Sequence, residues 1–332
     1  MSHGPAESAL PASIAGWLPA FIGLALTWGS SFLFTRVAVR ALPPLYLTLG
    51  EDIAALSVLL AVLVASRQRL PRDRRLWAHL AALAVPTSAS QILAAYGVQR
   101  VSSALAAILF ATAPLLAFLF AALVFRLDRL TPTRVVGAVL GFLGVLVVLG
   151  AWRGVGAGSL SGQLMCLAAA ACDGFAFPYL WLFVTARHRA GLPVVAAGQL
   201  VATMQLVIVA PVAVRTLPAP TAWTPGVAGS MLALGIVCIG TGQILQFRVT
   251  RLAGALTAAS VMYLVPLVAT TLGVAVLGER LTWNQPAGAA LIVAGLGVAS
   301  RPHRARIPAT PVYRADPGPS TVPPCRPVAA PR

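Results

Sequence analysis

Residues 96–145 of the chain read YGVQRVSSALAAILFATAPLLAFLFAALVFRLDRLTPTRVVGAVLGFLGV, and residues 247–298 repeat much of this pattern as FRVTRLAGALTAASVMYLVPLVATTLGVAVLGERLTWNQPAGAALIVAGLGV. The two stretches align at an offset of about 151 residues, with one single-residue slip. The clearest matches are Arg100 with Arg251, Pro114 with Pro266, and DRLT at 128–131 with ERLT at 279–282. The chain therefore contains two copies of one unit.

The composition places both copies in a membrane. Of the 332 residues, 58% are hydrophobic and 10% are charged, and the mean hydropathy is +0.86. A soluble protein has about 25% charged residues. The apolar residues form blocks of about 17–25 residues, which is the length that an α-helix needs to cross a bilayer. The blocks lack the alternating pattern of a membrane β-barrel.

Ten such blocks follow one another, and the repeat unit contains five of them. The expected spans are 17–39, 44–65, 76–98, 103–125, 134–151, 161–184, 193–214, 227–247, 253–277 and 285–300. Because five is odd, the second copy enters the membrane from the opposite side. The predicted fold is an all-α integral membrane protein with ten transmembrane helices arranged as two inverted five-helix repeats, an architecture of secondary transporters.

These spans also predict the domain organisation. The first repeat covers residues 17–151 and the second covers residues 161–300, with a connector at 152–160. Residues 1–16 form a short N-terminal segment. The tail, residues 301–332, has nine prolines and six arginines without apolar periodicity, so it is expected to be disordered.

The arginines predict the orientation of the chain. The formal net charge is +16, and every basic residue is Arg. If both termini are cytoplasmic, eighteen arginines lie on the inner side and six on the outer side, which agrees with the positive-inside rule. The bases do not form a stripe interleaved with aromatic residues, so nucleic acid is not expected as a partner. The tail arginines could contact anionic membrane lipid.

Three stretches give the chain a family resemblance. TWGSSFLFTRVAVRALPPL at 27–45, APLLAFLFAAL at 113–123 followed by DRLT, and VPLVATTLGVAVLGERLT at 265–282 resemble the drug/metabolite transporter superfamily, EamA type. The resemblance covers roughly residues 17–300. It implies a ten-helix carrier, often an exporter of amino acids, other metabolites or toxic compounds.

Two adjacent acids interrupt the second apolar block. Glu51 lies about seven residues into this span, hence about 10 Å deep at 1.5 Å per residue. One interpretation is a structural ion pair between Arg36 and Glu51, or between Arg36 and Asp52. Adjacent helical residues point about 100° apart, so one Arg cannot serve both acids well. The other interpretation is that Glu51 or Asp52 faces a cavity and binds a proton or a cationic substrate.

Asp173 is the most central acid. It lies about twelve residues into the sixth span, five residues before Pro178. A faint echo between SSFLF at 30–34 and DGFAF at 173–177 places it opposite Ser30 in the repeat. Asp173 is therefore predicted to line the substrate cavity and to serve as a second candidate for proton coupling, against the alternative of a neutral, packed acid.

Neutral polar and aromatic residues complete the candidate site. Such residues can line a cavity or hold helices together. The cavity candidates are Trp28, Ser30, Ser31, Gln91, Tyr96, Asp173, Tyr179, Gln243, Gln246 and Tyr263. Prolines interrupt helices, and the predicted hinge positions are Pro114, Pro178 and Pro266.

The sequence contains no enzyme signature. The four histidines fall in loops or near helix ends, and the cysteines show no zinc spacing. No metal, cofactor or ATP-binding loop is predicted, and the chain is not expected to be an enzyme. The predicted function is a secondary active transporter of the inner cell membrane, a monomer or homodimer, that exports an amino acid-like metabolite or a drug by alternating access, with a proton as the candidate coupling ion. The alternatives are an uncoupled facilitator, an importer, or a membrane sensor without transport.

Overall fold

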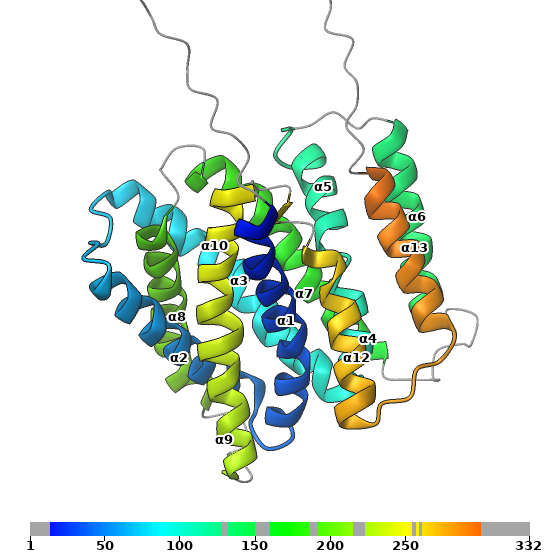
Figure 1. The fold of residues 1–332 in the computed structure, drawn as a ribbon, viewed down its shortest axis with the longest axis horizontal. Coiled ribbons are helices and arrows are strands. Elements are labelled where there is room, and N and C mark those ends of the chain that lie inside the picture. Colours follow the sequence, from blue (N-terminus) through cyan, green and yellow to red (C-terminus); the bar gives the residue numbers. More distant parts are fainter. Residues whose placement is uncertain are drawn as a thin grey trace, which may run out of the picture. The chain divides into compact units, whose positions relative to one another are not determined.

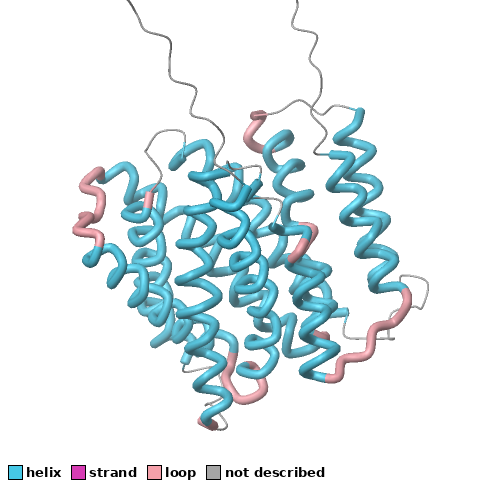
Figure 2. The backbone as a smooth tube through the Cα atoms, viewed as in Figure 1, coloured by secondary structure: helices cyan, strands magenta, loops and turns pink. Residues whose placement is uncertain are grey.

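A computed structural model describes residues 14–127, 132–149, 160–185, 191–214, 223–253, 257–258 and 261–299. This part of the chain is helical, with short connections (Figures 1 and 2). The predicted N-terminal segment up to residue 13, the connector at 152–159 and the tail at 301–332 lie outside the described residues, as do Asp128 and Arg129.

The helices of the first half form five membrane spans. They are α1 (Ile14–Ala38), α2 (Pro44–Ala65), α3 (Arg74–Arg100), α4 (Ser103–Phe110) with α5 (Ala113–Leu123), and α6 (Pro132–Leu149). Side chains cap two of them, since Asp73 accepts a hydrogen bond from the backbone N–H of Arg75 and Ser102 accepts one from Leu105. The fourth span is broken between α4 and α5, directly before Pro114.

The second half repeats this order with more irregular helices. Its elements are α7 (Leu160–Tyr179) with the π-helix η2 (Leu180–Thr185), α8 (Leu192–Val214), α9 (Pro225–Leu232) with the π-helix η3 (Ala233–Thr241) and α10 (Gly242–Ala253), the 3₁₀ turn η4 (Val261–Tyr263) before α12 (Val265–Leu277), and α13 (Asn284–Ala299). The eighth span continues six residues beyond the predicted end at 247, to Ala253.

The helices have the length and composition of membrane spans. Seven helical spans of the described part, the interrupted span of α4 and α5 among them, are long and apolar enough to cross a bilayer, and Val135–Val148 and Val265–Leu277 form shorter apolar helices. With α13, these make the ten spans of the predicted fold. Large apolar side chains such as Val139, Phe142 and Leu143 on α6 are exposed, as expected for a surface that faces lipid.

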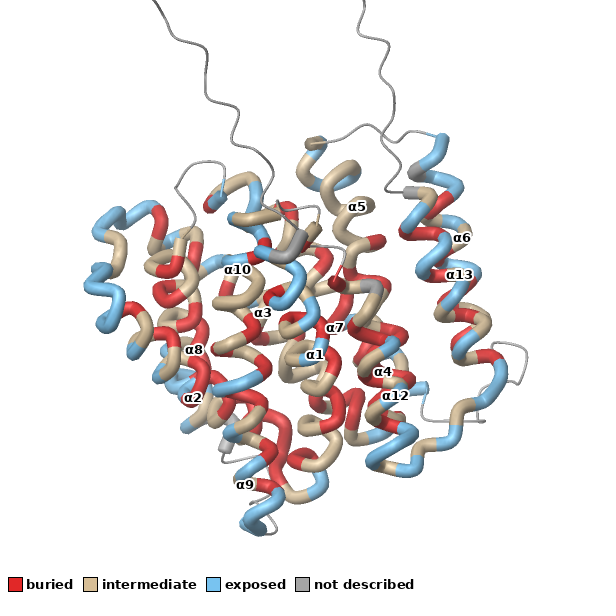
Figure 3. The backbone as a smooth tube through the Cα atoms, viewed as in Figure 1, coloured by how far each residue is buried: buried red, intermediate tan, exposed pale blue. Residues whose placement is uncertain are grey.

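Helix packing follows the inverted repeat. The helix α3 of the first half packs against α7 of the second half. The corresponding η3 and α10 of the second half pack against α1 of the first half. Likewise α5 packs against α7, while α12 packs against α1. The spans α2 and α8 also exchange partners in this way, since α2 packs against η3 and α8 packs against α3. Equivalent helices meet as well, namely α2 with α8 and α6 with α13. Each half is therefore completed by the other, and Figure 3 shows buried positions along the faces where these helices meet.

Glycines allow the closest of these contacts. A Cβ atom at Gly288 would meet the backbone of Gly144, and one at Gly295 would meet the backbone of Gly141. The helices α6 and α13 thus touch backbone to backbone, as small residues permit in membranes. At the end of α12, Gly278 adopts φ 64°, a left-handed conformation that ends the helix and turns the chain toward Glu279.

Candidate functional site

A cavity of about 580 Å³ lies between the two halves. Its walls come from α1, α2 and α3 of the first half and from α7, η2, α8, η3 and α10 of the second, with single residues of α4, η4 and α12. Ligand pockets in proteins commonly have volumes of about 300–1,000 Å³. The cavity therefore has room for a small organic molecule.

All three intramembrane acids of the sequence analysis line this cavity. Glu51 and Asp52 come from α2 and Asp173 comes from α7. Asp52 is fully buried; its Oδ1 accepts a hydrogen bond from Gln91 Nε2 at 3.3 Å, whereas its Oδ2 has no hydrogen-bond partner. Glu51 is 6% exposed and interacts electrostatically with Asp52.

Two neighbouring residues of α3 connect the acids. Gln91 bonds Asp52, and Ser90 contacts the Asp173 carboxylate while its Oγ donates to the carbonyl of Ala169 at 2.9 Å. Since residues 90 and 91 are adjacent, they bring the acids of α2 and α7 to neighbouring faces of one helix. The three carboxylates therefore belong to one polar region of the cavity.

Gln199 on α8 adds a buried amide that sequence reasoning missed. It is 6% exposed, and its Oε1 accepts a hydrogen bond from Gln243 Nε2 at 2.9 Å. Its Nε2 lies beside Asp52 but has no hydrogen-bond partner. A polar residue in the apolar block 193–214 was the available signal. That signal could not distinguish Gln199 from Gln205, which donates to the carbonyl of Ala81.

The predicted ion pair between Arg36 and Glu51 is not formed, and neither is a pair between Arg36 and Asp52. The guanidinium of Arg36 instead donates from Nη1 to the backbone carbonyls of Val98 (2.5 Å) and Gln99 (3.1 Å) at the end of α3. These carbonyls lie in the last turn of α3, where they need partners and where the helix dipole favours a cation. Sequence reasoning considered only acids as partners for this Arg.

The other sequence candidates divide into those that line the cavity and those that do not. Trp28, Ser31, Gln91, Gln243 and Gln246 line it, together with the three acids. Ser30 lies just outside, where its Oγ contacts Sγ of the lining residue Cys238 at 3.6 Å. Tyr96 is not a lining residue, and its ring lies beneath the guanidinium of Arg100. The side chain of Tyr263 lies outside the described residues.

Tyr179 belongs to an aromatic cluster beside the cavity. Its hydroxyl lies 3.0 Å from His79 Nδ1, and the His79 ring stacks on Phe183 with centroids 5.0 Å apart. His79 is on α3, and its neighbour Leu80 lines the cavity, as does Leu180 next to Tyr179. The cluster thus supports the cavity wall rather than forming its surface.

The predicted hinge prolines lie where helices change. Pro114 and Pro266 each occupy the first turn of a helix, α5 and α12, after a break in the preceding helix. Pro178 precedes the change from α7 to the π-helix η2. A second π-helix, η3, lines the cavity with Leu234, Cys238 and Ile239 and was not predicted, because no proline marks it.

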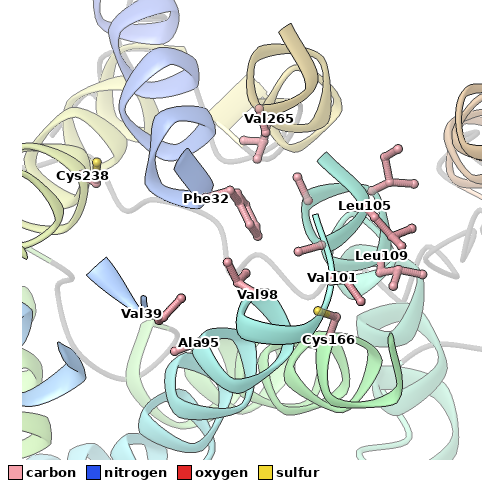
Figure 4. Packing of buried hydrophobic residues seen from close by; sticks show 14 of the residues in the cluster. Phe32, Val39, Ala95, Val98, Val101, Leu105, Leu109, Cys166, Cys238 and Val265 are labelled. Atoms are coloured by element: carbon pink, nitrogen blue, oxygen red, sulfur yellow. The ribbon is translucent and has the colours of Figure 1, made fainter. Parts of the chain in front are cut away.

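The cavity is open toward one end of the helices. Thr185, at the end of η2, and Thr250, near the end of α10, line it and are exposed, whereas the lining residues Leu47 and Val98 are fully buried. The closed end is apolar: Phe32, Val98, Leu105 and Val265 pack together there from α1, α3, α4 and α12 (Figure 4). Phe32 also makes an edge-to-face contact with Phe110.

A carboxylate reinforces the closed end. Glu279, which follows α12, accepts hydrogen bonds from the backbone N–H groups of Ser103 (2.8 Å) and Ala104 (3.1 Å) and from the Ser103 hydroxyl (2.9 Å). An anion at the start of a helix satisfies free N–H groups and interacts favourably with the helix dipole. The ERLT motif of the second half thus holds the first turn of α4 in the first half.

The described residues contain no group of three His, Cys, Asp or Glu side chains that could hold a metal ion. What the cavity offers instead is carboxylate, amide and hydroxyl groups beside aromatic and aliphatic walls. Such a surface binds small organic molecules through charge, hydrogen bonds and apolar contact.

Comparisons with known proteins agree with the two-part architecture. A model of the EamA-like transporter family matches residues 15–150 and again residues 160–301. Among solved structures, one titled "Crystal structure of protein" is similar with a TM-score of 0.58 and 24% sequence identity, over 86% of this chain and 98% of that chain. At this identity the likeness concerns the fold alone. No curated protein matches the chain.

Proposed function

Because the chain belongs to the EamA-like transporter family, we propose that it is a secondary active transporter that exports a small metabolite or drug across the cell membrane by alternating access. Members of this family are membrane transporters of small molecules. The direction of transport, the coupling ion and the substrate are the parts of the proposal that go beyond the family.

The cavity between the inverted halves carries this proposal. Its open end holds Thr185 and Thr250, which lie next to the Arg-rich connections that the positive-inside rule assigns to the cytoplasm. Its other end is closed by apolar packing and by the Glu279 contact. A cavity that is open to the cytoplasm and closed to the outside is ready to load a substrate for export. In this orientation both termini are cytoplasmic.

The inverted repeat supplies a route to the opposite state. In such transporters the two halves exchange their roles, so that one end closes as the other opens. Here α4 and α12 meet at the closed end, and both spans are interrupted at matched prolines, Pro114 and Pro266. We infer that these interruptions let the outer parts of the two spans move while the rest of each half stays packed.

The three acids are the candidates for proton coupling. Glu51, Asp52 and Asp173 share one cavity, and a buried carboxylate without a cation beside it is costly. A proton can neutralise such an acid when the cavity is empty and leave when substrate enters. We therefore assign coupling to these acids, with Asp173 on α7 as the group nearest the middle of its span.

Export is tested in cells. We would compare the culture medium of cells that contain wild type, Asp173→Asn, Asp73→Asn or an empty vector, at matched membrane levels, by untargeted mass spectrometry. Asp73 caps α3 outside the cavity, and Asn caps equally well, so this variant is the charge-matched control. The expected result is a compound enriched by wild type and Asp73→Asn but not by Asp173→Asn. Identical media for wild type and empty vector would contradict export of an abundant metabolite.

A further inference from the structure

The charges of the cavity lining all have one sign. Three carboxylates line it, and among the residues that the structure describes no Arg or His side chain does; the chain has no Lys. Arg36, the base that the sequence analysis considered as a partner for these acids, donates instead to the carbonyls of Val98 and Gln99. A substrate with a carboxylate group would meet like charges at these three residues, and like charges in a medium of low dielectric constant repel strongly.

The same cavity has an aromatic wall. The rings of Trp28, Phe32, Phe110, Phe177 and Phe247 line it. Aromatic faces attract cations, and the attraction grows when water is excluded. Aromatic rings also bind the apolar body of an organic molecule. The lining thus combines groups that attract positive charge with groups that attract hydrocarbon.

The side chains beside the buried acid Asp52 carry no charge. Asp52 is fully buried and lines the cavity, its Oδ2 accepts no hydrogen bond within normal distance, and the described side chains beside it are the neutral amides of Gln91 and Gln199. A buried carboxylate without a cationic partner is costly. Asp173 lies across the Ser90–Gln91 pair from Asp52, and its carboxylate also lines the cavity. A positively charged ligand group would satisfy these acids.

We propose that the cavity binds organic cations, meaning molecules with a positively charged nitrogen on an apolar or aromatic body and without a carboxylate. Asp52 and Asp173 bind the charged group, and the aromatic wall holds the body. This assignment rests on the proposed transport function and narrows its substrate: the amino acid-like substrate expected from the sequence is replaced by a cation without an acid group.

Binding to the full chain in lipid nanodiscs tests the charge class directly. The probes share one phenyl body and differ in charge: benzyltrimethylammonium and phenethylamine are cations, phenylalanine is a zwitterion, and 3-phenylpropionate is an anion. Binding is measured calorimetrically at pH 7. We expect both cations to bind at least about tenfold more tightly than the other two, which corresponds to ~1.4 kcal/mol. Benzyltrimethylammonium cannot lose its charge, so its binding reports on the cation itself.

Variants locate the effect in the cavity. The preference for cations should fall about tenfold or more in Asp52→Asn and in Asp173→Asn, and it should stay unchanged in Asp73→Asn. Two cavity variants are used so that a folding defect in one leaves the other informative. Equal or tighter binding of phenylalanine or 3-phenylpropionate by wild type would overturn the assignment, as would the absence of cation binding. A cation preference that survives both cavity substitutions would also overturn it.

A flux measurement separates this assignment from the transport proposal. In proteoliposomes preloaded with unlabelled benzyltrimethylammonium, the labelled cation should accumulate by exchange, and 3-phenylpropionate should not. If the cations bind but no probe exchanges, the transport proposal fails while the charge class of the site stands. If phenylalanine exchanges and the cations do not, transport stands and the assignment of cations is wrong.

Discussion

Gly235 lies where η3 crosses α2, at the point that carries the paired acids. A Cβ atom there would meet the backbone carbonyl of Glu51 and the side chain of Ala54. Nearby, a Cβ at Gly240 would approach Val58. The positions of Glu51 and Asp52 in the cavity therefore depend on the absence of side chains from the facing helix, because only glycine allows two helix backbones to approach this closely.

Replacing Gly235 by Ala should destabilise the protein. The added methyl group has no space, and overpacking of this kind costs about 1–3 kcal/mol. The matched control is Gly229→Ala on the same span, where a Cβ would have no neighbour within 4 Å and Ala is the better helix former. Thermal unfolding of the two variants in detergent should give a lower Tm for Gly235→Ala and an unchanged or higher Tm for Gly229→Ala. A Tm of Gly235→Ala equal to that of wild type would contradict the close approach.

At the scale of elements, single residues join helices that are distant in sequence. Glu279 follows α12 and binds the first turn of α4, about 176 positions earlier in the chain. The Ser103 that it binds is fully buried, and a Cβ at Gly273 would collide with the Glu279 carboxylate. The turn at Gly278, the space at Gly273 and the acid at 279 thus act together as one joint between the halves.

Removing this carboxylate should weaken the closed end of the cavity. In Glu279→Ala, the buried N–H groups of Ser103 and Ala104 lose a charged partner, and each such hydrogen bond contributes about 1.5–3 kcal/mol. We expect a lower Tm and faster labelling of a cysteine placed at Val98. The neighbouring Arg280 is exposed, so Arg280→Ala serves as the control and should change neither quantity. Equal behaviour of the two variants would show that the joint does not stabilise this state.

The contact between α6 and α13 gives a second prediction for elements. In Gly295→Val the new side chain would strike the backbone of Gly137 and Gly141, and β-branched groups cannot be accommodated between touching backbones. In Gly297→Val, two residues further along α13, nothing lies within 4 Å. In a thermal unfolding experiment, only Gly295→Val should have a lower Tm than wild type. A comparable decrease of Tm in both variants would mean that the β-branched residue itself, and not the contact between α6 and α13, causes the destabilisation.

At the scale of the whole molecule, the two halves form one cavity with a single open end. Neither half could enclose it alone, because α1 packs on α10 and α12 whereas α7 packs on α3 and α5. Six of the ten spans, three from each half, contribute several residues each to its walls. The lining residues Thr185 and Thr250 are exposed at one end of the cavity, and the lining residues Leu47 and Val98 are buried at the other end. The structure therefore represents a state whose cavity is open at one end.

Cysteine labelling tests this state and the orientation of the chain together. In a background with the native cysteines replaced by Ser, a membrane-impermeant maleimide should label Thr250→Cys in inside-out vesicles but not in intact cells. Trp223→Cys, at the opposite ends of the helices and exposed, should be labelled in intact cells. Both results follow if Thr250 faces the cytoplasm, as the positive-inside rule predicts. The reverse pattern would place the termini outside and make the open cavity a site for uptake.

The sequence by itself determined the number of spans, their inverted arrangement and the family. These properties follow from block length, from the odd number of helices in the repeat and from local motifs, none of which requires knowing how the helices pack. The limits of most spans agree with the helices within two or three residues. The boundary between the eighth and ninth spans does not, because the apolar pattern stops at residue 247 while the backbone hydrogen bonds of α10 continue to Ala253. Residue 253, the predicted start of the ninth span, therefore ends the eighth span instead.

Only the tertiary structure decided which polar residues meet. Glu51, Asp52 and Asp173 were identified from their depth alone, since a charge in a bilayer is costly wherever it points. Their shared cavity, the engagement of Arg36 by backbone carbonyls and the role of Gln199 depend on helix rotation and on contacts between different helices, such as that of Arg36 with Val98, 62 positions along the chain. Periodicity carries little information on rotation here, because apolar residues surround each helix on the lipid side and on the packed side alike.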